Sequence, residues 1–467
     1  MNSSSGIGNA ARATGFRMPR LVLPRRGVDL AKWAVIACDQ YTSEPEYWQR
    51  VGDRVGDAPS TLHLIFPEVH LGAPGAKARI AAIQQAMRRY LAEGLLEERE
   101  AGTVYVERMV DGRTRRGVML ELDLEHYDFS AESTSLIRPT EGTIVARLAP
   151  RIEVRREAAL ELPHVLVLID DPKDSVIGPV AEAARRGQLA KRYETELMLN
   201  GGHLAGHAVG AAHGARVVQS LAALAQPEAF ARRYGVPATT PPMLFAMGDG
   251  NHSLATAKVI WEQAKGSVGM DHPSRWALVE VENIHDAALH FAPIHRLLLG
   301  VKRDVRAALQ ASFGAKLTLT ECGTAQAMRE RLHALAQPDG KAGAERGAHR
   351  IAAGLIGPGA AFAVLEIADS PSALAVGALQ PFIDRFIHEE GGAADIDYVH
   401  GADVLERLAT QGGSGSAAPQ NVGFHIGTVG KSELLERVVR DGPLPRKTFS
   451  MGEAHEKRFY FEARRIR

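Results

Sequence analysis

The stretch Leu244-Phe245-Ala246-Met247-Gly248-Asp249-Gly250-Asn251-His252-Ser253-Leu254-Ala255-Thr256-Ala257 decides the fold of this chain, because it predicts a strand, a polar turn and a helix in direct succession. The apolar run that ends at Gly248 is typical of a buried strand, and the alanine-rich run that reaches Trp261 is typical of a helix. We call residues 248–253 the elbow. Its glycines permit backbone angles that a side chain would forbid, and the helix would direct unpaired N–H groups and its positive dipole end at the elbow. The sequence therefore predicts an anion site at this turn.

Four different polar side chains crowd the elbow, namely Asp249, Asn251, His252 and Ser253. The structural alternative is that Asn251 or Ser253 caps the helix and that Asp249 only ends the strand. A helix needs one cap, so the crowding favours a functional site.

The composition describes an ordinary globular chain. Its 467 residues are too many for one core, 45% are hydrophobic and 24% are charged. Lys plus Arg and Asp plus Glu both number 55, so no basic field favours nucleic acid. Cys38 and Cys322 lie far apart, which indicates neither a disulfide framework nor a thiolate zinc site. With no apolar run long enough to cross a bilayer, we expect a cytoplasmic protein that does not contact membranes.

Acidic residues follow two other predicted strands. The run 33–37 leads to Asp39, and the buried run 165–169 ends at Asp170 and Asp171. Paired acids at a strand end can hold Mg²⁺, so we predict Asp171 as a Mg²⁺ ligand, with capping of the following turn as the alternative. For Asp39 the alternative to a functional role is a turn aspartate. Two further strand predictions are residues 62–66 and a hairpin that turns at Asp111-Gly112.

Cationic side chains supply candidate anion contacts. Arg138 and Glu141 lie on either side of Pro139-Thr140, directly before Gly142. Arg147 opens a segment rich in arginine that could instead be a solvated helix face. His295 and Arg296 end an apolar segment, where they could act as an acid or base and as an anion contact. A structural role is the alternative for such a histidine.

An ordered set of motifs resembles a known family. The motifs are Trp33–Tyr41, Arg138–Thr143, Glu161–His164, the elbow, Pro293–Arg296, Ile396–Gly401 and Pro445–Lys447. Together, from about Leu21 to the end, they are similar to the bacterial family of domains of unknown function numbered 1015, commonly labelled ParB-like or SpoOJ-like. The resemblance implies a nucleotide-using enzyme, and in particular a small-molecule kinase related to the ParB-like free-serine kinases.

The resemblance also implies roles for single residues. The backbone of Gly248 and Gly250, with Asn251, His252 and Ser253, would hold the phosphates of ATP or ADP. Asp249 would bind Mg²⁺ or accept the hydroxyl proton, with Asp39 and Glu141 as competing bases. Where the commoner family pattern has His-His-Arg, this chain has Asn251-His252-Ser253. The guanidinium lost there must be replaced by another cation, or else the use of phosphate has changed. The candidate replacements are Arg138, Arg147, Arg151, Lys258 and Arg296.

We expect a mixed α/β protein with a flexible N-terminal arm (1–28), a ParB-like nucleotide-binding core (29–300), an inserted α/β module (301–390) and a C-terminal segment that packs back on the core (391–467). The expected partners are a nucleotide and a small hydroxyl-bearing substrate such as free serine, and homodimerisation is an open alternative to a monomer. Two other functions remain: a ParB-like nucleotide-binding switch with DNA or protein partners, and a non-catalytic binding protein with a decayed site.

Overall fold

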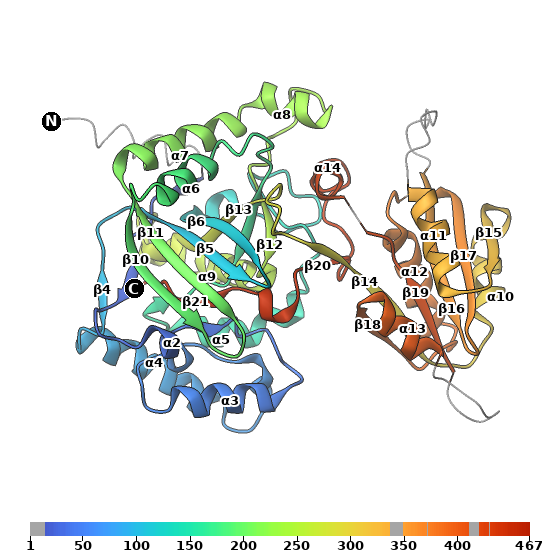
Figure 1. Cartoon of the computed structure of the whole chain (residues 1–467), viewed down its shortest axis with the longest axis horizontal. Coiled ribbons are helices and arrows are strands. Elements are labelled where there is room, and N and C mark those ends of the chain that lie inside the picture. The colour runs from blue at the N-terminus through green and yellow to red at the C-terminus, as the bar shows by residue number, and fades with distance from the viewer. Residues whose placement is uncertain (1–14, 337–348, 371, 411–419, 429) are drawn as a thin grey trace. The chain divides into compact units, whose positions relative to one another are not determined.

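A computed structural model describes residues 15–336, 349–370, 372–410, 420–428 and 430–467. Half of the predicted arm, residues 1–14, lies outside this range. The chain divides into two units, each a mixed α/β fold as predicted (Figure 1). Unit 1 comprises residues 1–290, 434–443 and 451–467, and unit 2 comprises residues 291–433 and 444–450. Unit 2 is thus an insertion in the sequence of unit 1. It starts ten residues before the predicted boundary at 301, and the last 77 residues contribute to both units.

The described residues of unit 1 form a nine-stranded sheet with the order β10-β11-β5-β6-β13-β9-β12-β7, in which β1 also pairs with β6 (Figure 1). The strands are β1 (Phe16–Arg17), β5 (Thr103–Val110), β6 (Arg113–Asp123), β7 (Ile137–Arg138), β9 (Leu166–Ile169), β10 (Ala190–Leu197), β11 (Gly202–Val209), β12 (Phe245–Asp249) and β13 (Trp276–Asn283). Three small sheets pair β2 (Val22–Pro24) with β4 (Leu96–Glu98), β3 (Val35–Ile36) with β21 (Phe459–Tyr460), and β8 (Leu160–Glu161) with β22 (Arg464–Arg465).

Local sequence patterns account for much of unit 1. The predicted hairpin is confirmed: β5 and β6 join at Asp111 and Gly112, whose φ angles of 50° and 72° suit the tight turns that match strand twist. The prediction of a strand at residues 62–66 was wrong. A 3₁₀ turn (Thr61–Leu64) forms there instead, because the Ser60 hydroxyl accepts a hydrogen bond from the Leu62 amide at 3.2 Å and so caps the turn.

One face of the nine-stranded sheet is mainly apolar. Leu120, Val167 and Val279 belong to this core, which helices of unit 1 cover with residues such as Val217 and Trp261. The helices of unit 1 are α2 (Leu30–Trp33), α3 (Pro45–Val55), α4 (Ala76–Ala92), α5 (Leu148–Arg156), α6 (Gly178–Arg185), α7 (Ala211–Leu224), α8 (Pro227–Tyr234) and α9 (Asn251–Val268). A further helix, α14 (Lys431–Asp441), ends in this unit. Alternation along β6 and β13 produces this face, because every second side chain points to it.

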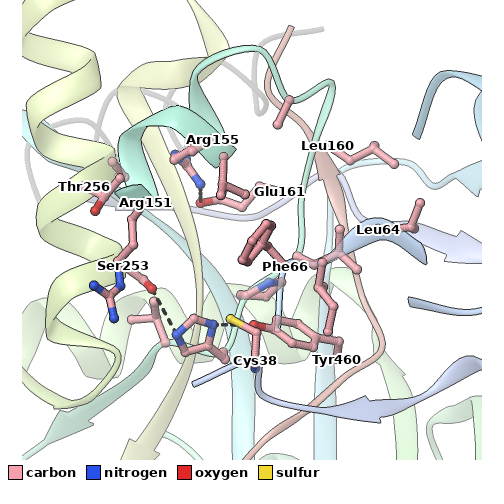
Figure 2. A pocket seen from close by; sticks show the side chains of 18 of the residues that line it. Cys38, Leu64, Phe66, Arg151, Arg155, Leu160, Glu161, Ser253, Thr256 and Tyr460 are labelled. Carbon is pink, nitrogen blue, oxygen red and sulfur yellow. Dashed lines mark hydrogen bonds and ion pairs between the residues drawn. The ribbon is translucent and has the colours of Figure 1, made fainter. Parts of the chain in front are cut away.

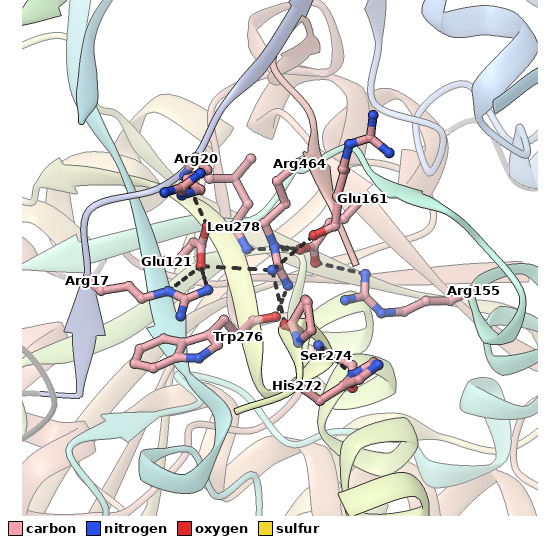
Figure 3. Close-up of polar contacts among 12 residues, drawn as sticks. Arg17, Arg20, Glu121, Arg155, Glu161, His272, Ser274, Trp276, Leu278 and Arg464 are labelled. Atoms are coloured by element: carbon pink, nitrogen blue, oxygen red, sulfur yellow. Dashed lines mark hydrogen bonds and ion pairs between the residues drawn. The ribbon is translucent and has the colours of Figure 1, made fainter. Parts of the chain in front are cut away.

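The opposite face buries charges as well as apolar groups. Glu280 and Glu282 on β13 pair with Arg458 and Arg115, and all four side chains are almost fully buried. Figure 3 shows a second network on the same unit, in which Arg464 lies between Glu121 and Glu161. Residues of the last segment of the chain, 451–467, therefore neutralise carboxylates of the sheet.

Unit 2 has a sheet with the order β15-β17-β16-β19-β14-β18, and β20 also pairs with β14. Its strands are β14 (Phe291–Val301), β15 (Leu317–Cys322), β16 (His349–Gly357), β17 (Ala361–Ser370), β18 (Asp395–His400), β19 (Gln420–His425) and β20 (Phe449–Met451). Helices α10 (Val305–Phe313) and α12 (Ala375–His388) share one apolar core with the sheet, while α11 (Ala325–Ala336) and α13 (Ala402–Thr410) share another. Unit 2 is therefore a three-layer sandwich.

Candidate functional site

The elbow forms as the sequence predicts. Strand β12 ends at Asp249, Gly250 takes the left-handed conformation with φ 80°, and the 18-residue helix α9 begins at Asn251. A Cβ atom at Gly250 would lie 3.0 Å from the Val165 backbone, and one at Gly248 would lie 3.1 Å from Leu168 and Met451. Gly250 is thus needed for its backbone angle, and a side chain at position 248 would press on its neighbours. The turn brings the N-terminus of α9 to the end of β12.

A lysine accompanies the acid of the elbow. The Asp249 carboxylate accepts a hydrogen bond from the Gly250 amide at 2.9 Å, and its other oxygen lies 3.1 Å from Nζ of Lys457. The Lys457 side chain is 9% exposed. Within the described residues, the buried Oδ1 of Asn251 has no hydrogen-bond partner. Lys457 therefore places a cation at the elbow, although this chain has Ser253 where the commoner family pattern has an arginine.

His164 connects the elbow to residues that are distant in sequence. Its Nε2 lies 3.0 Å from the Ser253 hydroxyl and 3.8 Å from Oδ2 of Asp39, and its Nδ1 lies 2.7 Å from the Tyr460 hydroxyl. The amide of Cys38 donates to that same hydroxyl at 3.2 Å. Because the Tyr460 oxygen already accepts from Cys38, we assign its proton to Nδ1 of His164, which leaves the proton of the neutral imidazole on Nε2.

This assignment separates the site from a serine hydrolase. In a Ser-His-Asp triad the serine and the aspartate contact opposite nitrogens of the imidazole, so that Nε2 can take the serine proton. Here Ser253 and Asp39 both lie beside Nε2, and a tyrosine occupies Nδ1. The imidazole is therefore arranged to donate a hydrogen bond beside Asp39 rather than to activate Ser253.

The pKa values of the carboxylates near His164 are shifted in opposite directions. Burial opposes the charge of Asp39, but His164, Gln40 and Lys457 outweigh it, so the pKa of Asp39 is lowered. Burial raises the pKa of Glu68, and its ion pair with Arg151 at 2.5 Å offsets only part of that effect. Burial also raises the pKa of the Cys38 thiol, so Cys38 is a neutral group rather than a nucleophile. Asp39 is therefore an ionised carboxylate at neutral pH.

A cavity of about 140 Å³ opens beside these residues, and Ser253, His164, Cys38 and Tyr460 line one part of it (Figure 2). Thr256, on the next turn of α9, also lines it. A small molecule in this cavity would thus reach both His164 and the first turns of the elbow helix.

Several predicted residues lie together in unit 1. Asp39 and Ser253 meet at His164, and Asp249 joins them through Lys457, which also lowers the pKa of Asp39. His252 occupies the second position of α9, inside the elbow.

Others among the predicted residues make different contacts. The Arg138 guanidinium is buried and donates to the carbonyls of residues 134, 135 and 241, and Arg147 is exposed. Glu141 follows β7 and is partly buried. Its neighbour Thr140 donates to the Met247 carbonyl at 2.6 Å, which ties this segment to β12.

His295 and Arg296 belong to unit 2. His295 stacks on His425 at 4.5 Å and accepts from the Ile426 amide, and burial lowers its pKa to about 3. Arg296 donates to Gln380 and to backbone carbonyls. These contacts hold the sheet and helices of unit 2 together.

The two predicted magnesium ligands lie at opposite ends of β9. Asp249 pairs with Leu166 at its start, because β9 and β12 are antiparallel, and Asp171 lies two residues beyond its last residue, Ile169. The five residues between them span about 17 Å, so one ion cannot contact both. Asp171 instead accepts from Ser175 and the Val176 amide, as a turn-capping residue does. In the described ranges, no group of three His, Cys, Asp or Glu side chains could hold a metal ion.

The sequence interpretation missed Lys457, Glu68 and Tyr460, and it used His164 only within a family motif. Lys457 and Tyr460 come from the last segment of the chain, where no local pattern distinguishes them. For His164 the signal existed, since it precedes the buried strand that carries Leu166. Its role becomes visible only when the fold brings Asp39 and Ser253 to the same imidazole.

Comparisons with known proteins place the chain in a family without assigning it an activity. A family model described as "Protein of unknown function (DUF1015)" matches residues 22–378. No curated protein matches. Across the part of the chain that the structure describes, no helix is long and apolar enough to cross a membrane.

Solved structures share features of the fold at low similarity. A free serine kinase mutant in complex with ADP matches with 13% identity and a TM-score of 0.36, over 73% of this chain and 91% of that chain. A conserved hypothetical protein from Pyrococcus furiosus matches with 13% identity and a TM-score of 0.32, over 73% and 90%. SbnI with a C-terminal truncation, from Staphylococcus aureus, matches with 9% identity and a TM-score of 0.31, over 72% and 82%. None of these is described as ParB-like or SpoOJ-like, so that label has no support.

Proposed function

Since the chain belongs to the family of unknown function DUF1015, we propose from the geometry of its site that it is a nucleotide-dependent small-molecule kinase with a hydroxyl acceptor. One observation carries the proposal: the elbow, a buried lysine and the Asp39–His164 pair lie together in one unit. Free serine kinase mutants have been solved in complex with ADP or AMP, but a TM-score of 0.36 is too low for that likeness to support the proposal. Free serine or a similar hydroxy compound is the starting proposal for the acceptor.

The proposed phosphate site is the elbow. Backbone amides at the start of α9 and the positive end of its dipole favour an anion there, and Lys457 adds a full positive charge. Asn251, His252 and Ser253 are proposed to contact the phosphates of ATP or ADP. Kinases depend mainly on such positioning and charge neutralisation, because the transferred group needs little covalent help.

Asp39 is the proposed base. A hydroxyl oxygen beside Nε2 of His164 would accept its hydrogen bond and could donate its own proton to the Asp39 carboxylate 3.8 Å from that nitrogen. That oxygen attacks the terminal phosphorus of a nucleoside di- or triphosphate. A new O–P bond forms, the bridging P–O bond breaks with its electron pair leaving on the nucleotide, and the hydroxyl proton goes to Asp39. Asp249 and Glu141 are the competing bases.

The proposed reaction needs no Mg²⁺ site built from the chain's own carboxylates alone. Among the residues that the structure describes, no group of carboxylates forms a cage for Mg²⁺, and both oxygens of Asp249 already have partners. Mg²⁺ usually binds through one or two carboxylates together with substrate phosphates. We therefore propose that it arrives on the nucleotide as part of the substrate.

Phosphorus NMR tests the proposal. The purified chain is incubated with Mg²⁺, with ATP, ADP or CTP, and with a pool of small alcohols, hydroxy acids and amino acids that includes serine. We expect a new phosphomonoester, and a loss of roughly 10²- to 10⁴-fold in its rate in Asp39→Asn, because general base catalysis contributes about that much. The matched control is Asp57→Asn, which removes an exposed carboxylate and should leave the rate unchanged.

Other outcomes would replace the proposal. Nucleotide hydrolysis without a new ester, together with retention of duplex DNA that weakens with salt, would favour the nucleotide switch. No turnover and no protection by any nucleotide against thermal unfolding would favour the decayed site, since a ligand that binds only the folded state stabilises it.

A further inference from the structure

The cavity beside the elbow is lined mainly by apolar side chains. They come from the segment after α3, from α4, from α5 and the segment that follows it, and from α9, and they are Leu64, Ile65, Phe66, Leu71, Met87, Val154, Leu160, Leu162, Leu254 and Ala257. Leu64, Met87 and Leu254 are each at most 4% exposed. Figure 2 shows Leu64, Phe66 and Leu160 around the same space as Ser253 and Tyr460. Such walls offer an apolar group burial from water.

The size of the cavity suits one ring. Its volume is about 140 Å³, and an engineered protein cavity of about 150 Å³ with aliphatic and aromatic walls stays dry and binds benzene. A group of about six carbon atoms would therefore fill the space. Free serine has a much smaller side chain and would leave most of the apolar wall without contacts.

The charged residues that line the cavity are already paired. Arg151 pairs with Glu68 at 2.5 Å, and Arg155 pairs with Glu161 at 2.8 Å. The ammonium and carboxylate of an amino acid would have to compete with these pairs. By contrast, a single hydroxyl would have to compete only with one hydrogen bond between uncharged groups, the 3.0 Å contact of Ser253 with Nε2 of His164 at one end of the cavity.

We propose that this cavity binds an uncharged alcohol whose apolar body is about the size of a benzene ring, and that this alcohol is the phosphoryl acceptor. The acceptor role rests on the proposed kinase function, whereas the binding of the alcohol does not. The hydroxyl lies at the Ser253 and His164 end, its oxygen forms the new bond to the terminal phosphorus of the nucleotide, and its proton passes to Asp39.

Binding is measured first, without nucleotide, with benzyl alcohol as the probe and serine as the comparison. We expect titration calorimetry of the full chain to detect the binding of benzyl alcohol and to show that serine binds at least tenfold more weakly. Toluene, which lacks the hydroxyl, should bind more weakly than benzyl alcohol but should still compete with it. Serine binding as tightly as benzyl alcohol, or no binding of benzyl alcohol, would overturn the proposal.

Two variants locate the probe. Ala158→Leu and Val154→Phe each add carbon atoms to the cavity wall, and we expect each to weaken the binding of benzyl alcohol at least tenfold. Ala81→Leu on the exposed side of α4 is the matched control and should leave the affinity unchanged. Each variant is used only if its unfolding midpoint shows a folded protein. Two cavity-filling variants are made so that the test can still be carried out if one of them does not fold. Equal affinity in a folded filled variant and the wild type would place the probe elsewhere and overturn the proposal.

Phosphorus NMR with the same alcohol separates this inference from the kinase proposal. Benzyl phosphate formed by the wild type and lost in a filled variant supports both. Binding at the cavity without any phosphoryl transfer to any acceptor overturns the kinase and the acceptor role but leaves the alcohol site. Transfer to serine at full rate in the filled variants overturns the cavity as the acceptor site and leaves the kinase.

Discussion

The two faces of the nine-stranded sheet in unit 1 are stabilised in different ways. One face buries mainly apolar side chains such as Leu120 and Val279, whereas the other buries Glu280 and Glu282 beside Leu278. Apolar surface packs against any helix with an apolar stripe, but a buried carboxylate needs one specific cation. The charged face therefore depends on particular residues from the end of the chain, and one of them, Lys457, also reaches the elbow.

The largest loss in the free energy of unfolding is expected when a buried cation is removed from the charged face. Arg458→Met would leave Glu280 and Glu462 buried without their shared cation, and removing one partner of a buried pair typically costs about 3–5 kcal/mol. Urea unfolding should show this loss in the free energy of unfolding. Arg185→Met, at an exposed helix position, is the control. A loss in Arg458→Met no greater than in this control would show that the buried network contributes little.

The apolar face should respond to lost volume. Leu120 is fully buried, and Leu120→Ala should lower the free energy of unfolding by about 2–5 kcal/mol through the cavity it leaves. This loss should be the same at pH 5 and pH 8, since no titrating group is involved. A loss that changed with pH would show that the two faces are not energetically separate.

The charged face should also respond to pH. Burial raises the pKa of Glu282 to about 7, with Arg115 opposing that shift, whereas an unfolded glutamate titrates near 4.3. The raised pKa stabilises the fold fully below the unfolded value, and this stabilisation disappears as pH rises through about 7. We expect the free energy of unfolding to fall by about 2–3 kcal/mol between pH 5 and pH 8. Glu282→Gln should flatten that fall, and an unchanged slope in the variant would assign it to another group.

The smallest effect concerns an exposed pair on the same sheet. Lys191 and Glu194 lie 2.7 Å apart, but their side chains are 48% and 46% exposed. Solvent screens such pairs, so Lys191→Ala should leave the urea midpoint unchanged. A clear loss of stability would contradict the view that burial, rather than pairing itself, distinguishes the charged face.

Local patterns in the sequence predicted the strand-turn-helix at the elbow and the hairpin at Asp111 and Gly112, because glycine positions and apolar periodicity determine both. The relation of Asp171 to Asp249 was not predictable. Both follow apolar strands, and only the antiparallel pairing of β9 with β12 places them at opposite ends. Strand direction within a sheet depends on long-range topology, which a single run of residues does not encode.

The partners of the elbow were unpredictable for the same reason. Tyr460 reaches His164 across 296 positions of sequence, and Lys457 reaches Asp249 from the same segment. Neither contact follows from propensity or spacing. Asp39 was a candidate because it follows a predicted strand, yet its lowered pKa depends on His164 and Lys457, which only the fold brings near it.

The central claim is that the elbow holds nucleotide phosphates, and ADP protection against thermal unfolding tests it most directly. Ser253→Asp places a negative charge at the third position of α9, where an acid suits the helix dipole but repels phosphate. We expect ADP at about 100 times its Kd to stabilise the wild type by about 2.7 kcal/mol, Ser253→Ala to keep most of that protection, and Ser253→Asp to lose it. Equal protection of all three proteins would place the nucleotide away from the elbow and contradict the claim.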